Sequence, residues 1–323
     1  MLYVRSVGVI GAGAMGSQIA EIMAMNGYDV YLKDVSKEFI DRGMSNVKKD
    51  LDGLVAFHKS KGDREIARIQ EQDGVHLTED QRQAIRAKLR PTYDENRASE
   101  FLSKIHPAEN YEPFKNVDLV IEAIIEEIEA KKTLFAELDP ILPTHCVLAS
   151  NTSTLSITEM ASAAKKRRDK VIGTHFFNPP ITLPLIEVIP GLETSEDTVS
   201  DVIDFLTPLR NHRFPMLPIR VKEVPGFLVN RILGAMLNEA YALYEEGVAS
   251  MRDIDQAMKA GAGMPMGPFE LSDLIGLDVL YHVEENIRKM EGQPMPRPTQ
   301  IVKKMFYSGR LGKKTGKGFY DYS

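Results

Sequence analysis

Short apolar runs alternate with helix-like segments through the first half of the chain. The intervening segments place apolar residues at near-helical spacing, as in residues 17–27, which end at Gly27. Buried apolar strands that alternate with helices predict a mostly parallel sheet covered on both faces, which is the doubly wound α/β architecture. The expected strands are 5–10, 29–34, 117–124, 145–150 and 171–177.

Residues 36–100 interrupt this alternation and are dense in charged and amide side chains. Helical periodicity predicts helices at 38–57, 63–71 and 79–88, ahead of a short strand near 102–106. A connection of roughly 70 residues between two strands far exceeds the usual few residues, and such insertions often carry function. We therefore expect a helical arm, and the plainer alternative is a solvated excursion from the sheet.

The pattern becomes helical from Val224 onward. Residues 226–246 carry a broad apolar stripe, which predicts a long helix in a core or at an interface. Later helices are expected at 251–261, 267–275, 278–291 and 298–307, with a loop at 292–298. A chain of this length favours two domains, which we place at 1–223 and 224–323 with a boundary near 222–225.

Composition and charge narrow the function classes. The 323 residues are 43% hydrophobic and 27% charged, which is ordinary for a globular protein. The net charge of −6 and the pI of about 5.7 offer no basic field to nucleic acid. No apolar run approaches the ~18 residues of a membrane span, and no basic, apolar leader precedes the first strand. We expect a cytoplasmic protein with no nucleic-acid partner, no membrane partner and no bound metal.

The single cysteine, Cys146, excludes an internal disulfide and suits a reducing compartment. It lies in the apolar run HCVLAS, where a buried strand residue is the favoured interpretation. A thiol nucleophile is the alternative.

The turn GAGAMG follows the first expected strand and has the spacing G-x-G-x-x-G at Gly11, Gly13 and Gly16. The first glycine permits a tight turn, the second lets a pyrophosphate approach the backbone, and the third allows the helix to pack closely on the strand. The helix would begin at Ala14 and Met15 and direct its N–H groups at the phosphates. Since a strand precedes and an amphipathic helix follows, the motif predicts dinucleotide binding rather than a plain structural turn.

The second expected strand ends at Asp34, which follows Gly16 by 18 residues. An acid at about this distance is typical of the group that accepts hydrogen bonds from the ribose hydroxyls. Asp34 favours NAD, because a carboxylate repels the 2′-phosphate of NADP. The nearby Lys33 and Lys37 keep NADP open as the alternative.

One histidine and one glutamate interrupt apolar runs near the middle of the chain. His175 ends the run VIGTHFF, Glu187 lies within LPLIEVI, and both are six residues from Ile181 in a proline-rich loop. If the two runs form a hairpin centred on Ile181, the side chains lie opposite each other with Cβ atoms about 5 Å apart. The pattern predicts a carboxylate–imidazole pair able to accept a substrate proton. A purely structural pair at a sheet edge is the alternative.

A run of hydroxyl and amide side chains follows the strand at 145–150, in LASNTSTLSI. Small polar groups in one turn can donate hydrogen bonds to a substrate oxygen and to nicotinamide. They can equally be a helix N-cap, and the residues alone do not decide between the two.

Together these features resemble the L-3-hydroxyacyl-CoA dehydrogenase family, and especially its bacterial 3-hydroxybutyryl-CoA dehydrogenases. The matching motifs occur in family order across nearly the whole chain. They are GAGAMG, Asp34, IEAIIEE (121–127), ASNTSTLSI (149–157), THFFNPP (174–180), LIEVI (185–189), VPGFLVNRIL (224–233), GAGMPMGPFELSDLIGLD (261–278) and GKKTGKGFYDYS (312–323).

The resemblance implies a Rossmann-type NAD domain with a helical insertion, a helical C-terminal domain that forms a homodimer, and reversible conversion of 3-hydroxyacyl-CoA to 3-oxoacyl-CoA. The family's catalytic histidine falls on His175 and its orienting glutamate on Glu187. Its substrate-side serine and asparagine fall on Ser153 and Asn230. The implied cofactor contacts are Gly11, Gly13, Ala14, Met15, Gly16, Asp34, Glu126, Lys131, Ser153, Asn178 and Lys314.

The helical arm departs from the family pattern, because it is longer by roughly 30 residues. A serine and a lysine that bind coenzyme A in some members fall on Asp50 and Phe57. Lys49 matches a lysine of bacterial members and Lys59 is nearby, so both are candidate coenzyme A contacts, with exposed solvating lysines as the alternative. Two other functions stay open: a dehydrogenase of non-CoA hydroxy or sugar acids, as in lambda-crystallin-like relatives, and a nicotinamide-binding protein without turnover.

Overall fold

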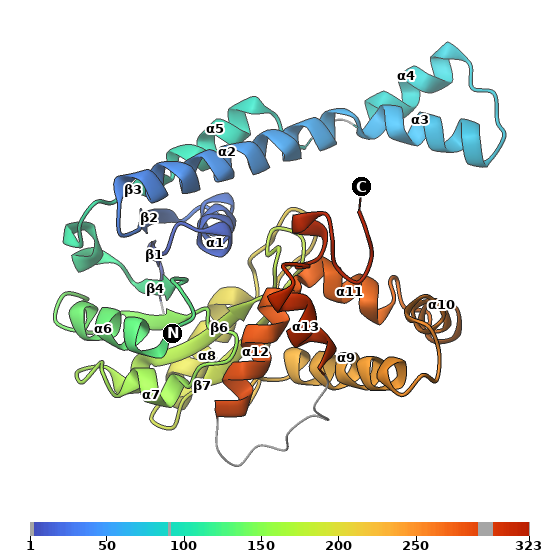
Figure 1. Ribbon diagram of the computed structural model, residues 1–323. Helices are drawn as coiled ribbons and strands as arrows, with labels where there is room; N and C mark the ends of the chain where they lie inside the picture. Colours follow the sequence, from blue (N-terminus) through green and yellow to red (C-terminus); the bar gives the residue numbers. More distant parts are fainter. Residues whose placement is uncertain (1–2, 90–91, 290–299, 323) are drawn as a thin grey trace. The chain divides into compact units, whose positions relative to one another are not determined.

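The computed structural model describes residues 3–89, 92–289 and 300–322 (Figure 1). It divides into two compact units. The first comprises the described residues up to Thr152 together with Ile157–Val221, and the second comprises Ser153–Ser156 together with the described residues from Lys222 onward. The loop expected at 292–298 lies outside the described residues.

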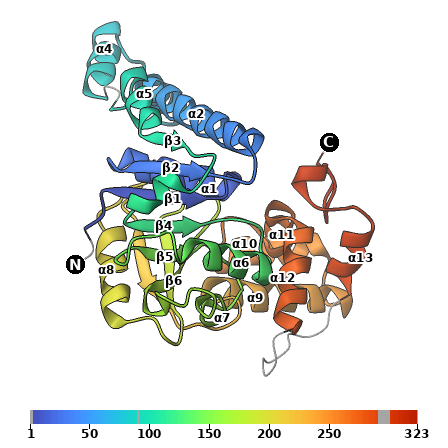
Figure 2. The same cartoon turned by 90° about the vertical axis from the view of Figure 1, so that its left-hand side faces the viewer.

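Within the described part of the first unit, eight strands form one sheet in the order β3-β2-β1-β4-β5-β6-β7-β8. Figure 2 shows the succession from β3 to β6. Neighbours from β3 to β6 pair in parallel, which confirms the predicted doubly wound arrangement. The strands are β1 Ser6–Ile10, β2 Asp29–Lys33, β3 Ile105–Pro107, β4 Leu119–Glu122, β5 Val147–Ser150, β6 Val171–Phe176, β7 Leu185–Pro190 and β8 Leu217–Arg220. The apolar pattern does not predict β8, because its four residues are half-buried or exposed and include Pro218.

The direction of strand progression reverses between β1 and β4, and ligands of such sheets bind outside the carboxyl ends of the strands at this point. Helices α1 and α8 pack against the sheet and share one apolar core with it. This core contains Val9 of β1, Ile19 of α1 and Val202 of α8. The helices of this unit outside the arm are α1 Ala14–Met25, α6 Ile128–Leu138, α7 Ile157–Ala161 and α8 Glu196–Leu206, with short 3-10 turns η1 Glu112–Asn116 and η2 Arg168–Lys170.

The helical arm consists of α2 Lys37–Lys59, α3 Lys61–Gln72, α4 Glu79–Lys88 and α5 Glu95–Ser103. Helices α2 and α5 pack against each other beside α1, whereas α3 and α4 form a hairpin at the far end of α2 (Figure 1). The three predicted arm helices are confirmed. Sequence periodicity does not reveal α5, since Phe101 is its only buried residue.

The second unit is helical, as predicted. Its helices are α9 Val229–Glu245, α10 Met251–Ala262, α11 Pro268–Ile275, α12 Leu277–Lys289 and α13 Ile301–Tyr307, followed by η3 Lys313–Thr315. Phe269 is fully buried, and its ring lies 4.9 Å from Phe319 and 5.6 Å from Tyr241 between ring centroids. These aromatic rings hold α9, α11 and the C-terminal segment together in the core of this unit.

Candidate active site

The glycine-rich turn joins β1 to α1 and requires glycine at two of its three positions. Gly11 has a φ of +104°, and a Cβ there would overlap the carbonyl of Ala123. A Cβ on Gly16 would overlap the carbonyl oxygen of Gly11. Gly13, in contrast, has no described atom within 4 Å of the position its Cβ would take. One side of the turn is therefore open, as an approaching pyrophosphate requires.

Helix α1 begins at this turn without a side-chain cap, since Gly13 is its N-cap residue and its first turn contains no acid. The backbone N–H groups and the positive end of the helix dipole are thereby available to an anionic group. Uncapped N–H groups next to an open glycine fit a dinucleotide phosphate, which Ala14 and Met15 at the helix start would contact through their backbone.

Asp34 lies at the end of β2, beside the turn. Its Oδ2 accepts a hydrogen bond from the Ala12 N–H at 2.6 Å, and its Oδ1 accepts one from the Val35 N–H at 2.6 Å. These bonds fix the carboxylate where a ribose hydroxyl donor is expected. Lys33 donates to the Asp34 carbonyl and stacks on Tyr111, while Lys37 pairs with Asp41 and Glu109.

A buried polar network occupies the carboxyl ends of β4 and β5. Glu122 is fully buried, and its Oε1 accepts from Lys131 Nζ at 2.6 Å and from the Ile124 N–H at 2.7 Å. Its Oε2 accepts from Ser150 Oγ at 2.6 Å. Lys131 Nζ also lies 3.4 Å from Glu126, which accepts a hydrogen bond from Thr152 at 2.7 Å. The structure thus brings the predicted Glu126 and Lys131 together.

Sequence reasoning misses Glu122, Ser150 and Asn151 as individual members of this region. Asn151 Oδ1 accepts the Phe176 N–H at 2.8 Å, so this side chain fixes the end of β6 next to His175. The signal for Glu122 is a lone acid in the apolar run LVIEAI (119–124), and the same kind of signal identifies Glu187.

β6 and β7 form the predicted hairpin, and their antiparallel register pairs His175 with Glu187. His175 Nδ1 lies 2.8 Å from Glu187 Oε2. The histidine is 4% exposed and the glutamate 0%, and the His175 ring packs on Phe177 at 4.5 Å between centroids. The geometric prediction of a cross-strand pair is confirmed. With Nδ1 directed at the carboxylate, the remaining ring nitrogen, Nε2, is the atom suited to exchange a proton with a substrate.

The other predicted site residues lie at several places in the fold. Ser153 and Asn230 are half-buried members of the second unit, Asn178 is exposed in the loop after β6, and Lys314 pairs with Asp278 at 2.6 Å. Burial acts to raise the pKa of Asp278, but the hydrogen bond and the positive charge of Lys314 act in the opposite direction, and the pKa is lowered. Lys49 is exposed on α2, and Lys59 at the end of α2 forms an ion pair with Glu95 of α5.

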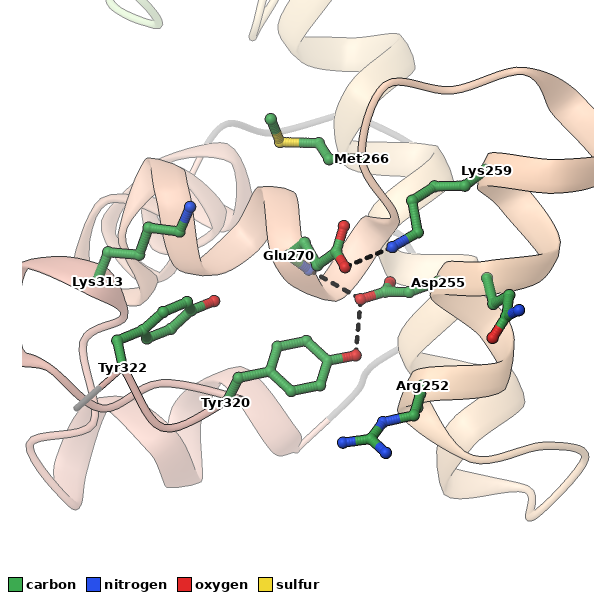
Figure 3. A pocket seen from close by; sticks show the side chains of 9 residues that line it. Arg252, Asp255, Lys259, Met266, Glu270, Lys313, Tyr320 and Tyr322 are labelled. Atoms are coloured by element: carbon green, nitrogen blue, oxygen red, sulfur yellow. Dashed lines mark hydrogen bonds and ion pairs between the residues drawn. The ribbon is translucent and has the colours of Figure 1, made fainter. Parts of the chain in front are cut away.

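The second unit also holds a pocket of about 370 Å³ (Figure 3). Asp255 in this pocket accepts hydrogen bonds from Phe269 N at 2.8 Å, Glu270 N at 3.1 Å and Tyr320 Oη at 2.7 Å. Lys259 pairs with Glu270 at 2.6 Å. These bonds fasten α10, α11 and the C-terminal segment to one another, so the polar groups of this pocket serve the fold of the unit.

Among the residues that the structure describes, no cluster of three or more histidine, cysteine or carboxylate side chains could hold a metal ion. No helix within those residues has both the length and the apolar composition to cross a membrane. Cys146 is fully buried and lies directly before β5 rather than within a strand. Burial raises the pKa of its thiol to about 12, which favours a buried core residue over a thiol nucleophile.

Residues 6–89 and 70–224 match the sequence profile of the 3-hydroxyacyl-CoA dehydrogenase NAD binding domain, and residues 226–322 match that of the C-terminal domain. The chain belongs to the 3-hydroxyacyl-CoA dehydrogenase family. The family resemblance noted in the sequence is thereby confirmed. The predictions of an oxidoreductase, of a Rossmann-type domain and of NAD as the cofactor are confirmed with it.

Three relatives extend over nearly the whole length of this dehydrogenase. A 3-hydroxybutyryl-CoA dehydrogenase from Clostridioides difficile is 39% identical and covers 98% of both chains. The human mitochondrial hydroxyacyl-coenzyme A dehydrogenase is 35% identical over 99% of this chain and 92% of its own. The crystal structure of (S)-3-hydroxybutyryl-CoA dehydrogenase PaaH1 from Ralstonia eutropha superposes with a TM-score of 0.80 at 34% identity, covering 99% of this chain and 100% of that one.

Proposed function

We propose that this dehydrogenase interconverts (S)-3-hydroxyacyl-CoA and 3-oxoacyl-CoA with NAD, and that it acts on short chains such as 3-hydroxybutyryl-CoA and acetoacetyl-CoA. The observation that carries the proposal is the His175–Glu187 pair at the carboxyl end of β6, within a domain of this family. The names of the relatives supply the substrate class and the short-chain preference.

The cofactor would be held by the glycine-rich turn at Gly11, Gly13 and Gly16, with Asp34 accepting hydrogen bonds from the ribose hydroxyls. Bound NAD supplies the hydride acceptor and, when reduced, the hydride donor. The remaining proposed cofactor contacts are Ala14, Met15, Glu126, Lys131, Ser153, Asn178 and Lys314.

His175 would take the proton of the 3-hydroxyl group at Nε2 during oxidation and return it during reduction. Glu187 orients the ring through Nδ1 and stabilises the imidazolium that forms. Ser153 and Asn230 would donate hydrogen bonds to the reacting oxygen or to the thioester carbonyl, which keeps the substrate carbon in position. We further propose that Lys49 and Lys59 of α2 attract the coenzyme A phosphates.

We also propose that the NAD domain and the substrate and dimerisation domain are residues 1–223 and 224–323, and that the protein is a cytoplasmic homodimer. Large apolar side chains of the second unit support the dimer, since Ile232 on α9 and Val248 after it are each 64% exposed and Leu274 on α11 is 51% exposed. Sedimentation should give twice the monomer mass of 36.2 kDa, and a monomer mass would reject the dimer.

A substrate panel tests the function directly. One set of assays measures the reduction of acetoacetyl-CoA and longer 3-oxoacyl-CoA esters with NADH and with NADPH. A second set measures the oxidation of non-CoA hydroxy and sugar acids with NAD. We expect turnover of the thioesters with NADH, highest for the shortest chains. Absence of thioester reduction together with oxidation of an acid would favour the lambda-crystallin-like alternative, and absence of all turnover would favour a nicotinamide-binding protein.

A further inference from the structure

A short segment between α8 and β8, residues 210–212, contacts two parts of the first unit. The proposed chemistry requires these two parts to keep a fixed position relative to each other. On one side the segment contacts helix α1, which starts at the glycine-rich turn. On the other it contacts the loop of residues 177–184, which connects the strand of His175 to the strand of Glu187. We name residues 210–212 the bridging segment.

The loop side of the bridging segment is held by two hydrogen bonds. Asn211 Nδ2 donates to the Pro180 carbonyl at 3.0 Å, and the His212 backbone N–H donates to the Ile181 carbonyl at 3.1 Å. Asn211 is buried, and its Oδ1 accepts the backbone N–H groups of Arg213 and Phe214 at 2.9 and 2.8 Å. The amide of Asn211 is therefore fixed at both ends, and it holds the loop at its midpoint.

The helix side is held by side chains from α1 and its C-cap. His212 Nε2 lies 2.5 Å from Glu21 Oε1, and Asn26 exchanges two hydrogen bonds with the backbone of Arg210 at 2.8 and 3.0 Å. Glu21 is 0% exposed and the His212 side chain 10%. A second carboxylate–imidazole pair is thus buried in the first unit, apart from the His175–Glu187 pair.

A net gain in stability over an apolar pair is not the expected role of Glu21 and His212. Burial is the main reason that the pKa of Glu21 is raised above its ordinary value, although His212 opposes the shift, and Asp50 adds to it. The Glu21 Oε2 atom is buried and accepts no hydrogen bond from any described residue. Because the desolvation of a buried ion pair roughly offsets its attraction, such a pair contributes little net stability. It does fix the distance between the elements that carry its two partners.

We propose that Glu21 and His212 are positioning residues, which hold the 177–184 loop against α1 so that the hairpin carrying His175 stays aligned with the cofactor turn. The inference rests on the proposed function, in which α1 starts at the turn that binds the cofactor pyrophosphate and the hairpin carries the proton acceptor. Proton and hydride transfer require both groups in one geometry, and a displacement of about 1 Å can lower the rate by about 10²-fold.

Steady-state kinetics of three variants test the proposal, with acetoacetyl-CoA and NADH as substrates. We expect His212→Ala to lower kcat by about ten- to a hundredfold. The dissociation constant of NADH, measured by its fluorescence, should change by less than about twofold, because the turn itself is untouched. His212→Gln should recover most of kcat, since its Nε2–H group can still donate to Glu21. Asn211→Ala removes the bond to Pro180 together with the two bonds that Oδ1 accepts from Arg213 and Phe214, and it should lower kcat in the same way.

A buried ion pair elsewhere in the same unit is the matched control. Asp139 lies 3.1 Å from Arg167, and the two side chains are 7% and 3% exposed, but Asp139 has no contact with the 177–184 loop among the described residues. Asp139→Asn should lower Tm and leave kcat unchanged. The proposal is overturned if His212→Ala keeps the wild-type kcat, or if His212→Gln recovers none of the loss. Should His212→Ala fail to fold, Asn211→Ala and His212→Gln carry the same test.

The wild-type rate separates the two levels of the account. A wild type that reduces no acyl-CoA rejects the proposed function. If the wild type reduces acetoacetyl-CoA and the Asn211→Ala and His212→Ala variants have the same kcat as the wild type, only the positioning role is rejected.

Discussion

His175 and Glu187 face each other across two antiparallel strands, with Nδ1 of the imidazole 2.8 Å from Oε2 of the carboxylate. Every residue of β6 is buried, and the glutamate is fully enclosed. A carboxylate held in this way keeps the ring in one orientation and favours the imidazolium once a proton arrives. The pair therefore combines the two properties that a general acid–base group needs, a fixed direction and an accommodated charge.

Replacing Glu187 by glutamine should lower kcat by about 10²-fold while leaving the KM for NADH near its wild-type value. The amide can still accept the Nδ1 hydrogen bond, but it does not neutralise the imidazolium. Steady-state reduction of acetoacetyl-CoA measures both constants. Glu196→Gln is the control, because it makes the same change in the exposed Glu196–Arg220 pair and should leave kcat unchanged. A wild-type kcat in the Glu187→Gln variant would show that the negative charge of Glu187 is not needed for the reaction.

Substitution of Gly13 by alanine should weaken NADH binding by about tenfold or more, which is a change of about 1.4 kcal/mol, and leave Tm nearly unchanged. The new methyl group meets no described atom, but it fills the side of the turn that a pyrophosphate would approach. Gly16→Ala should instead lower Tm, because its methyl group overlaps the Gly11 carbonyl. Fluorescence titration and thermal melts distinguish the two variants, and unchanged NADH affinity in Gly13→Ala would place the cofactor elsewhere.

Lys131→Met should reduce the free energy of unfolding by about 3–5 kcal/mol, because it leaves a buried carboxylate without its cation. Glu122 is fully buried 2.6 Å from the Lys131 ammonium group and has no other cation within ion-pair distance among the described residues. The double variant Glu122→Gln, Lys131→Met should recover part of the loss, since it removes the stranded charge. Urea unfolding measures all three proteins. Equal stability of Lys131→Met and wild type would show that the two groups do not interact as a charged pair.

Cys146 should be unreactive towards a thiol reagent in the native protein at pH 8. Burial raises the pKa of its thiol to about 12, so the group remains neutral at this pH, and the side chain is fully enclosed. Unfolding in guanidinium should expose one thiol per chain, since the sequence contains a single cysteine. Rapid labelling of the folded protein would contradict the buried position.

The His175–Glu187 register could be predicted from sequence because three local signals agree. Strand side chains alternate with a period of two, the proline-rich loop marks the turn, and the two polar residues are equidistant from Ile181. The glycine turn is equally local, since its spacing, the strand before it and the helix after it lie within one short segment. Such features depend on neighbouring residues, so the sequence displays them directly.

Contacts between distant segments could not be predicted in this way. Glu21 and His212 are separated by 191 positions, and neither lies in a pattern that points to the other. The link between Asn151 and Phe176 likewise depends on the neighbouring placement of β5 and β6. Helix α5 and strand β8 bury too few side chains for their periodicity to stand out. Sequence reasoning identified the proposed acid–base pair, and the tertiary structure was needed to find what holds its loop.

The rate of acetoacetyl-CoA reduction by NADH, compared between wild type and His175→Ala, tests the central claim most directly. Removal of a general acid–base group typically lowers the rate by about 10²- to 10⁴-fold, so we expect wild-type turnover and a loss of kcat within this range. The dissociation constant of NADH should stay close to the wild-type value, which would show that the cofactor turn is intact. Equal kcat in the two proteins would contradict the assignment of His175 as the residue that exchanges the substrate proton.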